Sequence, residues 1–155
     1  MEKVKKILVP VDFSDNCRVA LDWAMSIADK VDADVFLFHV LDIPDGLQVR
    51  AERHQLLDTD VKERMKEEAT RDLQAFADKY DGDRIKFYPE ITEGKPFIEI
   101  VKAAKYYSMD LIVMGTHGRT GLPQMIIGSV AEKVVRKSPC PVLTVKHPDF
   151  KFELG

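Results

Sequence analysis

The feature that most constrains the fold is a regular alternation of short apolar runs with longer amphipathic segments. Five apolar runs bounded by polar or turn-forming residues are expected to be strands, over 5–11, 34–41, 85–92, 109–114 and 141–145. Between them, apolar side chains recur at spacings of three and four, which is typical of one helix face, over 14–31, 61–80, 96–107 and 128–137. Strands that alternate with helices in this way predict an α/β fold with a parallel sheet covered on both faces.

The order of the strands follows from one proline and from the handedness of the crossovers. Pro89 cannot donate to a central hydrogen-bond ladder, so the third strand is expected at an edge. Right-handed crossovers then predict a doubly wound open sheet of five mainly parallel strands, in the order 3-2-1-4-5. Ligands bind such sheets at the carboxyl ends of the strands where the order reverses. Here the first and fourth strands meet at that point, and they end at Asp12 and Gly115.

Size and charge limit the possible classes of protein. The 155 residues, 45% of them hydrophobic, suit one domain, which we expect over 1–146 with a loose tail over 147–155. A net charge of -3 lacks the basic excess of a general nucleic-acid binder. The apolar run over 7–11 is too short for a signal peptide or a membrane span. We therefore expect a cytoplasmic protein that binds neither nucleic acid nor membranes, with Cys17 and Cys140 as buried free thiols.

The segment that follows the fourth strand is the most informative about function. It contains Gly115, Gly118 and Gly128, and Ser129 opens the last helix, so backbone N–H groups and the positive end of a helix dipole can face one anion. Glycine lets the main chain approach a phosphate without a Cβ, and Arg119 adds a positive charge. The segment has neither the Gly-Lys-Ser/Thr of a Walker A loop nor the GxGxxG of a dinucleotide fingerprint.

Simpler interpretations of the same residues stay open. Ser129 with Glu132 has the sequence of a capping box, which would need no ligand. Asp12 is also compatible with a plain turn, and His39 with a hydrogen-bonded strand residue. Charges on the polar face of the second helix, such as Lys62 and Lys66, are expected to be a solvated surface.

The glycine spacing resembles that of the ATP-binding members of the universal stress protein family. The pattern is a glycine, two residues, a glycine, nine residues and then Gly-Ser, from Gly115 to Ser129. The likeness extends to the opening 6–14, the pair His39-Val40 and the closing 139–145, and so spans almost the whole chain. It implies a Rossmann-like fold of the adenine nucleotide alpha hydrolase-like kind.

The resemblance also implies a binding site for ATP, with ADP or AMP as alternatives. Val11, Val40 and Met114 are expected to face the adenine, Asp12 the ribose or a Mg²⁺ ion, and the glycine segment the triphosphate. His117 lies between matched positions and has no assigned role. The full set of expected nucleotide-binding residues is Pro10, Val11, Asp12, Val40, Met114, Gly115, Gly118, Arg119, Gly128, Ser129 and Val130.

These observations predict a nucleotide-dependent switch in stress response, with no catalytic residue assigned. We also expect a homodimer through the last strand, 142–145, because this strand should be a sheet edge without charged residues. One alternative is a slow ATP hydrolase or an adenylyl-transfer enzyme of a related fold, although the Ser-Gly-Gly-x-Asp-Ser and HxGH patterns of such enzymes are absent. Another is an interaction protein that binds no nucleotide, against which the intact glycine spacing argues.

Overall fold

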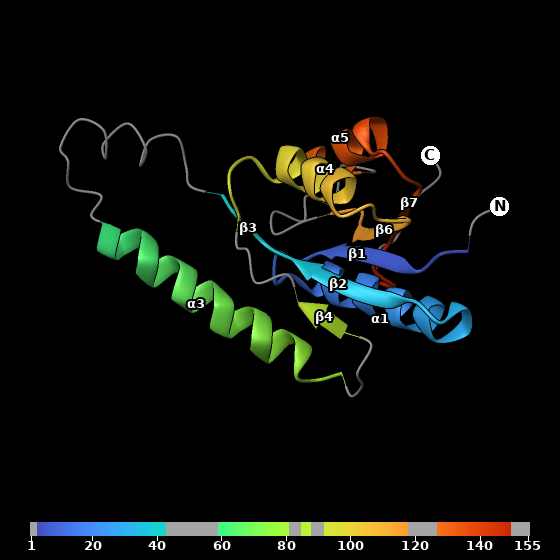
Figure 1. The fold of residues 1–155 in the computed structure, drawn as a ribbon, viewed down its shortest axis with the longest axis horizontal. Helices are drawn as coiled ribbons and strands as arrows, with labels where there is room; N and C mark the ends of the chain where they lie inside the picture. The colour runs from blue at the N-terminus through green and yellow to red at the C-terminus, as the bar shows by residue number, and fades with distance from the viewer. Residues whose placement is uncertain (1–2, 43–58, 81–84, 88–91, 118–126, 150–155) are drawn as a thin grey trace.

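The computed structural model describes residues 3–42, 59–80, 85–87, 92–117 and 127–149. Its main sheet is entirely parallel and has the strand order β4-β2-β1-β6-β7 (Figure 1). The strands are β1 (Lys6–Pro10), β2 (Asp34–Phe38), β4 (Ile85–Phe87), β6 (Leu111–Gly115) and β7 (Val142–Val145). In chain order these five strands give the expected sequence 3-2-1-4-5, and the α/β fold class is confirmed.

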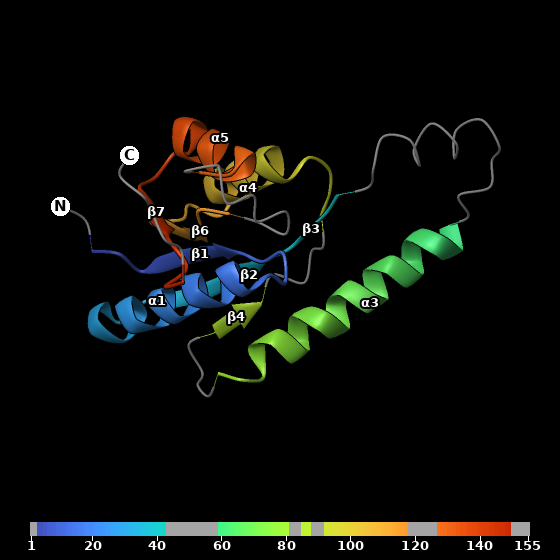
Figure 2. The same ribbon diagram turned by 180° about the vertical axis from the view of Figure 1, so that it is seen from behind.

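Helices cover both faces of this sheet. They are α1 (Asp15–Val31), α3 (Thr59–Ala77), α4 (Pro96–Tyr106) and α5 (Ser129–Lys137). Figures 1 and 2 show α4 and α5 together on one face, with α1 and α3 on the other. Alternate residues of β1 divide between the two cores: Leu8 packs on the side of α4 and α5, whereas Ile7 and Val9 pack on the side of α1 and α3. The continuous apolar run of this strand therefore reflects burial on both faces.

Local hydrogen bonds explain where α1 begins and ends. The hydroxyl of Ser14 caps the helix by accepting a hydrogen bond from the N–H of Cys17, as expected from the sequence. At the other end Asp32 adopts the left-handed conformation, with φ of 60°, and donates its N–H to the carbonyl of Ala28. The helix thus returns the chain directly into β2.

Two predicted strands are interrupted. The second stops at Phe38, and Val40–Leu41 forms a separate strand, β3, that pairs in parallel with β5 (Thr92–Glu93). β2 ends at Phe38 because its partner β1 ends opposite, at Pro10. Beyond this point the chain pairs with β5 instead. The described residues of the third predicted strand also belong to two sheets, β4 to the main sheet and β5 to the pair with β3, and Pro89 lies outside the described residues. The short β3–β5 pair contributes to the candidate site below.

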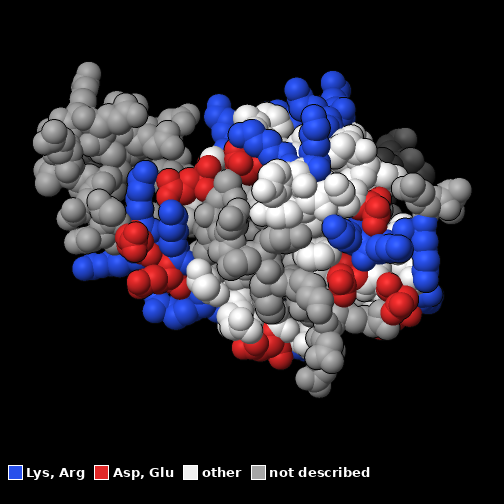
Figure 3. Space-filling model, in the orientation of Figure 1, with Lys and Arg blue, Asp and Glu red and all other residues white. Residues whose placement is uncertain are grey.

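Basic side chains gather over α4 and α5, whereas α3 carries both signs of charge (Figure 3). Part of the positive charge on α4 and α5 is neutralised by acidic residues of the same helix. Lys102 Nζ lies 2.9 Å from Glu99 Oε1 in α4, and Arg136 Nη2 lies 3.0 Å from Glu132 Oε1 in α5. These pairs join residues three or four positions apart and add little to the tertiary fold.

Candidate functional site

A pocket of about 650 Å³ opens at the carboxyl ends of β1, β3 and β6. This volume is in the usual range for a small-molecule site. The structure brings together most of the residues that the sequence predicted here: Pro10, Val11, Asp12, Val40, Met114, Gly115, Gly128, Ser129 and Val130. The other two, Gly118 and Arg119, lie outside the described residues. The location is the point at which the strand order reverses, between β1 and β6.

The base of the pocket is apolar and well supported. Val11 is 4% exposed and Met114 is 6% exposed, so both belong to the core as well as to the pocket. The N–H of Val11 donates to the carbonyl of Phe38 at 2.8 Å, which fixes the end of β1 against β2. Val40 is half-buried and extends the apolar surface from β3. Such a surface can receive a flat aromatic group.

A tight turn places Asp12 at the rim of this base. Its Oδ1 accepts hydrogen bonds from the N–H of Ser14 at 3.0 Å and from the hydroxyl of Ser14 at 2.6 Å. Phe13, between them, has a φ of 64°, which is uncommon for a residue that is not glycine. The carboxylate of Asp12 therefore shapes the turn and also lines the pocket.

Aromatic contacts of Phe13 stabilise the turn over residues 12–14. The centre of the Phe13 ring lies 4.7 Å from the centre of the His39 ring, and Phe13 meets Phe76 of α3 edge to face with the ring centres 6.2 Å apart. His39 is buried, and its Nδ1 lies 2.7 Å from the carbonyl oxygen of Val11. Because a carbonyl can only accept, Nδ1 is the protonated nitrogen that donates. The expectation that His39 is a hydrogen-bonded residue is confirmed, although it lies between β2 and β3 rather than inside a strand.

The opposite rim is formed by the start of α5. Gly128 is the N-cap of the helix, with φ of -70° and ψ of 157°, and its N–H donates to the carbonyl of Thr116 at 2.6 Å. Ser129 is the first helical residue and is exposed, so the capping-box interpretation, with Ser129 as the cap, is wrong. The amino end of α5 lines the pocket through residues 128–131, so its dipole favours an anion there.

Close packing explains the glycine at position 115. A Cβ there would lie 3.0 Å from the Cβ of Asn16 and 3.2 Å from the carbonyl oxygens of Asn16 and His117. The glycine lets the end of β6 pack closely against the first turn of α1. His117 itself lines the pocket, and its Nδ1 lies 2.9 Å from the hydroxyl of Thr116.

The sequence did not predict the contribution of α3 to the pocket. Four of its residues, Met65, Glu68, Ala69 and Asp72, line one side. Met65 and Ala69 lie four residues apart on the apolar face of this helix. Glu68 and Asp72 are also four residues apart, and each follows Met65 or Ala69 by three positions, so all four share one face. Only that shared helical face could have indicated their position, because exposed carboxylates on a helix are usually solvated.

Cys17 adds a thiol to the same surroundings. It is buried, its Sγ lies 3.1 Å from the carbonyl oxygen of Ser14, and it lines the pocket. Burial, and then the nearby charge of Asp12, raise the pKa of the Cys17 thiol to about 11. The thiol is therefore protonated and unreactive near neutral pH. Both cysteines are free, but Cys140 is only half-buried.

Within residues 3–42, 59–80, 85–87, 92–117 and 127–149, no three His, Cys, Asp or Glu side chains are arranged to hold a metal ion. Among those same residues, no helix is both long and apolar enough to cross a membrane.

Comparison with known proteins gives a consistent result. Residues 3–146 match the profile of the Universal stress protein family. The chain is 38% identical over 144 residues to universal stress protein MJ0531 of Methanocaldococcus jannaschii, covering 93% of this chain and 83% of that protein. It is 33% identical over 157 residues to universal stress protein MJ0577 of the same organism, covering 92% and 95%.

Solved structures agree with this at the level of the fold. The structure of MJ0577 superimposes with a TM-score of 0.78 at 33% identity, covering 96% of this chain and 99% of that chain. UspA of Lactobacillus plantarum gives a TM-score of 0.70 at 29% identity, covering 94% and 99%. A universal stress protein in complex with cAMP gives 0.64 at 22% identity, covering 94% and 98%, and this likeness shows the fold alone. The chain belongs to the universal stress protein family.

Proposed function

We propose that this protein binds an adenine nucleotide, ATP foremost, in the pocket between β1 and β6 and acts as a nucleotide-dependent switch in stress response. The observation that carries the proposal is the pairing of an apolar base with the amino end of α5 across one pocket. An adenine ring suits the apolar bottom of the pocket, and a phosphate suits the amino terminus of a helix. The fold itself can hold such a ligand, because a universal stress protein of this fold was solved with cAMP.

The proposed contacts follow the sequence pattern. Adenine lies against Val11, Val40 and Met114, next to Pro10. Asp12 faces the ribose hydroxyls or a Mg²⁺ ion on the phosphates, since carboxylates bind either partner well. The residues assigned to the phosphates are Gly115, Gly118, Arg119, Gly128, Ser129 and Val130.

Replacement of Gly128 by valine tests this assignment. The backbone at this position suits any residue, so the fold should remain, while the added side chain obstructs the approach of a phosphate to the amino end of α5. We expect ATP affinity, measured by calorimetry, to fall at least about a hundredfold, which corresponds to about 2.7 kcal/mol. Ser129→Ala should weaken binding less, and Ser26→Ala, at an exposed position of α1, is the matched control. Unchanged affinity in Gly128→Val with an intact circular dichroism spectrum would contradict the phosphate assignment.

We expect hydrolysis of the bound nucleotide to be slow. Rapid transfer to water requires a positioned base and a cation for the developing charge. Two imidazoles, those of His39 and His117, are among the described pocket residues, and each already has a hydrogen-bond partner: the carbonyl of Val11 for His39 and the hydroxyl of Thr116 for His117. Phosphate release with Mg²⁺ and saturating ATP should stay below about 1 s⁻¹. A faster rate that His117→Ala removes would identify an enzyme instead.

A switch of this kind is also proposed to be a homodimer that pairs through β7. The strand lies at the edge of the sheet, next to β6. The carbonyl oxygens of Pro141 and Val145 accept hydrogen bonds from the N–H groups of Ile112 in β6 and of Thr116, just after β6. The backbone groups of Val142 and Thr144 therefore point outward, by the two-residue period of a strand. Among the described residues, no strand pairs with this side of β7, and such a row can bind the same row of a second copy about a two-fold axis.

This geometry selects a specific variant. Thr144→Pro removes an outward N–H and leaves the hydrogen bonds to β6, which a proline at an edge tolerates. Sedimentation should show a dimer for the unmodified protein and a monomer for Thr144→Pro at micromolar concentration. A monomer for the unmodified protein, with and without ATP, would rule out this assembly.

A further inference from the structure

Helix α3 is held in different ways along its length. Its carboxyl-terminal half packs into the core shared with α1 through Leu73, Phe76 and Ala77. The guanidinium of Arg18 lies 4.6 Å from the centre of the Phe76 ring, and the hydroxyl of Tyr80, just beyond the helix, donates to Asp22 Oδ1 at 2.7 Å. This half is therefore fixed to the domain by buried apolar contacts.

The amino-terminal half has no comparable apolar support among the described side chains. From residue 61 to residue 68, every side chain is exposed or only half-buried, including Val61, which is 39% exposed. Yet this half supplies Met65 and Glu68 to the side of the pocket. A polar interaction joins this half to the rest of the domain.

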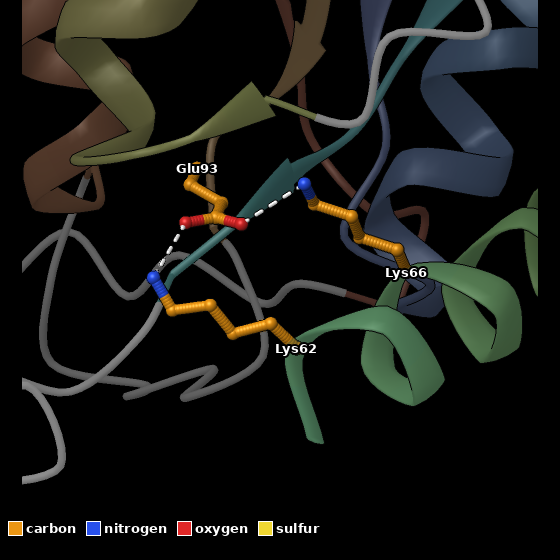
Figure 4. Close-up of polar contacts among 3 residues, drawn as sticks. All are labelled: Lys62, Lys66 and Glu93. Carbon is orange, nitrogen blue, oxygen red and sulfur yellow. Dashed lines mark hydrogen bonds and ion pairs between the residues drawn. The ribbon is translucent and has the colours of Figure 1, made fainter. Parts of the chain in front are cut away.

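That interaction is a pair of salt bridges to Glu93. Lys62 Nζ lies 3.3 Å from Glu93 Oε2, and Lys66 Nζ lies 3.1 Å from Oε1 of the same carboxylate (Figure 4). The two lysines are four residues apart on one helix face, and each reaches a different oxygen of the carboxylate. The hydrogen bond from Lys66 is the main cause that lowers the pKa of Glu93 below its usual value, so the group is ionised at neutral pH. We call this arrangement the Glu93 ion pairs.

Glu93 connects α3 to a second side of the pocket. It lies on β5 directly opposite Leu41 of β3, and the N–H of Gly94 donates to the carbonyl of Leu41 at 3.2 Å. Leu41 and Pro96, three residues after Glu93, both line the pocket. The Glu93 ion pairs thus join the side of the pocket made by β3 and α4 to the side made by α3.

We propose that Glu93 is a positioning residue for ligand binding: by binding Lys62 and Lys66, it keeps the amino-terminal half of α3 against the pocket and slows ligand release. The inference rests on the proposed nucleotide-binding function. Glu93 itself is not among the pocket residues, so it acts through the position of Met65 and Glu68. When the pairs break, the ligand loses the apolar contact of that side and dissociates faster.

The expected effect is moderate, because the pairs are partly exposed. The side chains of Lys62, Lys66 and Glu93 are 43%, 46% and 30% exposed. Pairs of this kind contribute up to about 1 kcal/mol each, which corresponds to about a fivefold change in affinity. We therefore expect Glu93→Gln to weaken ATP binding about three- to tenfold, mainly through a faster dissociation rate. Added salt should weaken binding in the unmodified protein more than in Glu93→Gln.

Hydrogen exchange provides a measurement that does not depend on any ligand. In the protein without nucleotide, Glu93→Gln should speed amide exchange over 61–68 and leave 73–77 unchanged, because only the first segment relies on the ion pairs. Lys66→Gln should act in the same direction. Lys102→Gln is the matched control, since it also removes one exposed lysine pair but lies on α4.

Reversing the charges separates positioning from a general effect of the substitution. Glu93→Lys should weaken binding more than Glu93→Gln, because three cations then face one another. Combining it with Lys62→Glu and Lys66→Glu should restore both the slow exchange over 61–68 and the ATP affinity to within about twofold of the unmodified protein.

The outcomes are distinguishable. Faster exchange over 61–68 without a change in ATP affinity would overturn the link between α3 and the pocket. Unchanged exchange in both Glu93→Gln and Lys66→Gln would overturn the role of the ion pairs. If the unmodified protein binds no adenine nucleotide, the proposed function fails and the link to the ligand fails with it. The exchange data would then still decide whether Glu93 holds α3.

Discussion

Two sides of the same pocket are built on different physical principles. The side formed by β1, β6 and α5 is part of the core: Val11 and Met114 are buried, and backbone hydrogen bonds join Val11 to Phe38 and Gly128 to Thr116. The side formed by the amino-terminal half of α3 is exposed and is held by the ion pairs of Lys62 and Lys66 with Glu93. One side can move only if the core opens, whereas the other can move alone.

The difference shows how a stable domain can have a responsive site. Strands joined by backbone hydrogen bonds and apolar packing separate only when much of the domain unfolds. Partly exposed polar contacts break locally, at a low cost in free energy. In the proposed nucleotide site, the rigid side would define where the ligand lies, and the α3 side would affect how long it stays. If the two sides differ in this way, substitutions on the rigid side should destabilise the protein more than substitutions on the α3 side.

The largest effect is expected from a substitution on the rigid side. Ile112 of β6 is 0% exposed and packs in the core beneath α4 and α5. Ile112→Ala should lower the free energy of unfolding by about 2–5 kcal/mol, because it removes buried methyl groups and leaves a cavity. Met65→Ala, on the half-buried α3 side, should cost only about 1 kcal/mol. Denaturant unfolding measures both, and equal losses would contradict the proposed difference between the two sides.

A second substitution adds atoms to the rigid side instead of removing them. Gly115→Val should destabilise the protein by about 1–3 kcal/mol, because the new side chain meets fixed backbone oxygens of Asn16 and His117. Gly115→Ala should cost less, since only the Cβ is crowded. Thermal unfolding of the two variants gives the order. A neutral effect of valine would mean that this side of the pocket can relax.

The buried thiol predicts a dependence of stability on pH. Cys17 is 4% exposed, and burial followed by the charge of Asp12 raises its pKa from 9.0 to about 11. Well below pH 9 the thiol is protonated in both states, so its contribution to stability is complete. Between pH 9 and 11 the unfolded chain loses this proton first, and the free energy of unfolding falls by about 2 kcal/mol.

The measurement is a comparison with Cys17→Ala over the same pH range. Urea unfolding of both proteins from pH 8 to about pH 11 separates the thiol from other groups that titrate there, because those groups are present in both. The unmodified protein should lose more stability than the variant. Parallel curves would show that the thiol is not kept neutral by burial.

The smallest effect concerns the anchored end of α3. Tyr80→Phe removes the hydrogen bond to Asp22 and should lower the free energy of unfolding by about 0.5–1 kcal/mol. Tyr106→Phe is the matched control, because Tyr106 is 81% exposed and its substitution should be neutral within about 0.5 kcal/mol. A larger loss for Tyr106→Phe, seen in chemical unfolding, would mean that exposure is a poor guide here.

The fold could be predicted from the sequence because its causes are periodic. Continuous apolar runs indicate buried strands, and apolar residues at spacings of three and four indicate helix faces. Pro89 indicated the edge strand. The prediction failed where the sequence has no such pattern. The break at His39 was missed because both Phe38 and Val40 are apolar, and nothing local shows that β1 stops at Pro10.

The site was predictable where backbone geometry limits the choice of residue. Gly115 leaves no room for a Cβ, and Gly128 stands at the N-cap of α5, so these positions have a sequence pattern. The ion pair between Lys62 and Glu93 joins residues 31 positions apart that resemble any other exposed charges. The left-handed conformation of Phe13 was also missed, because phenylalanine rarely adopts it.

The pairing of β1 with β6 has a consequence for the order in which the protein can fold. Asp110, just before β6, accepts hydrogen bonds through Oδ2 from the N–H groups of Lys5 and Lys6, the second of them 104 residues away along the chain. During synthesis β1 can meet β2 early, but its other edge must wait until residues 111–115 exist. Contacts this distant are slow to form. The pocket between these two strands therefore appears only in a nearly complete chain, and a bound ligand would stabilise the finished fold over every earlier intermediate.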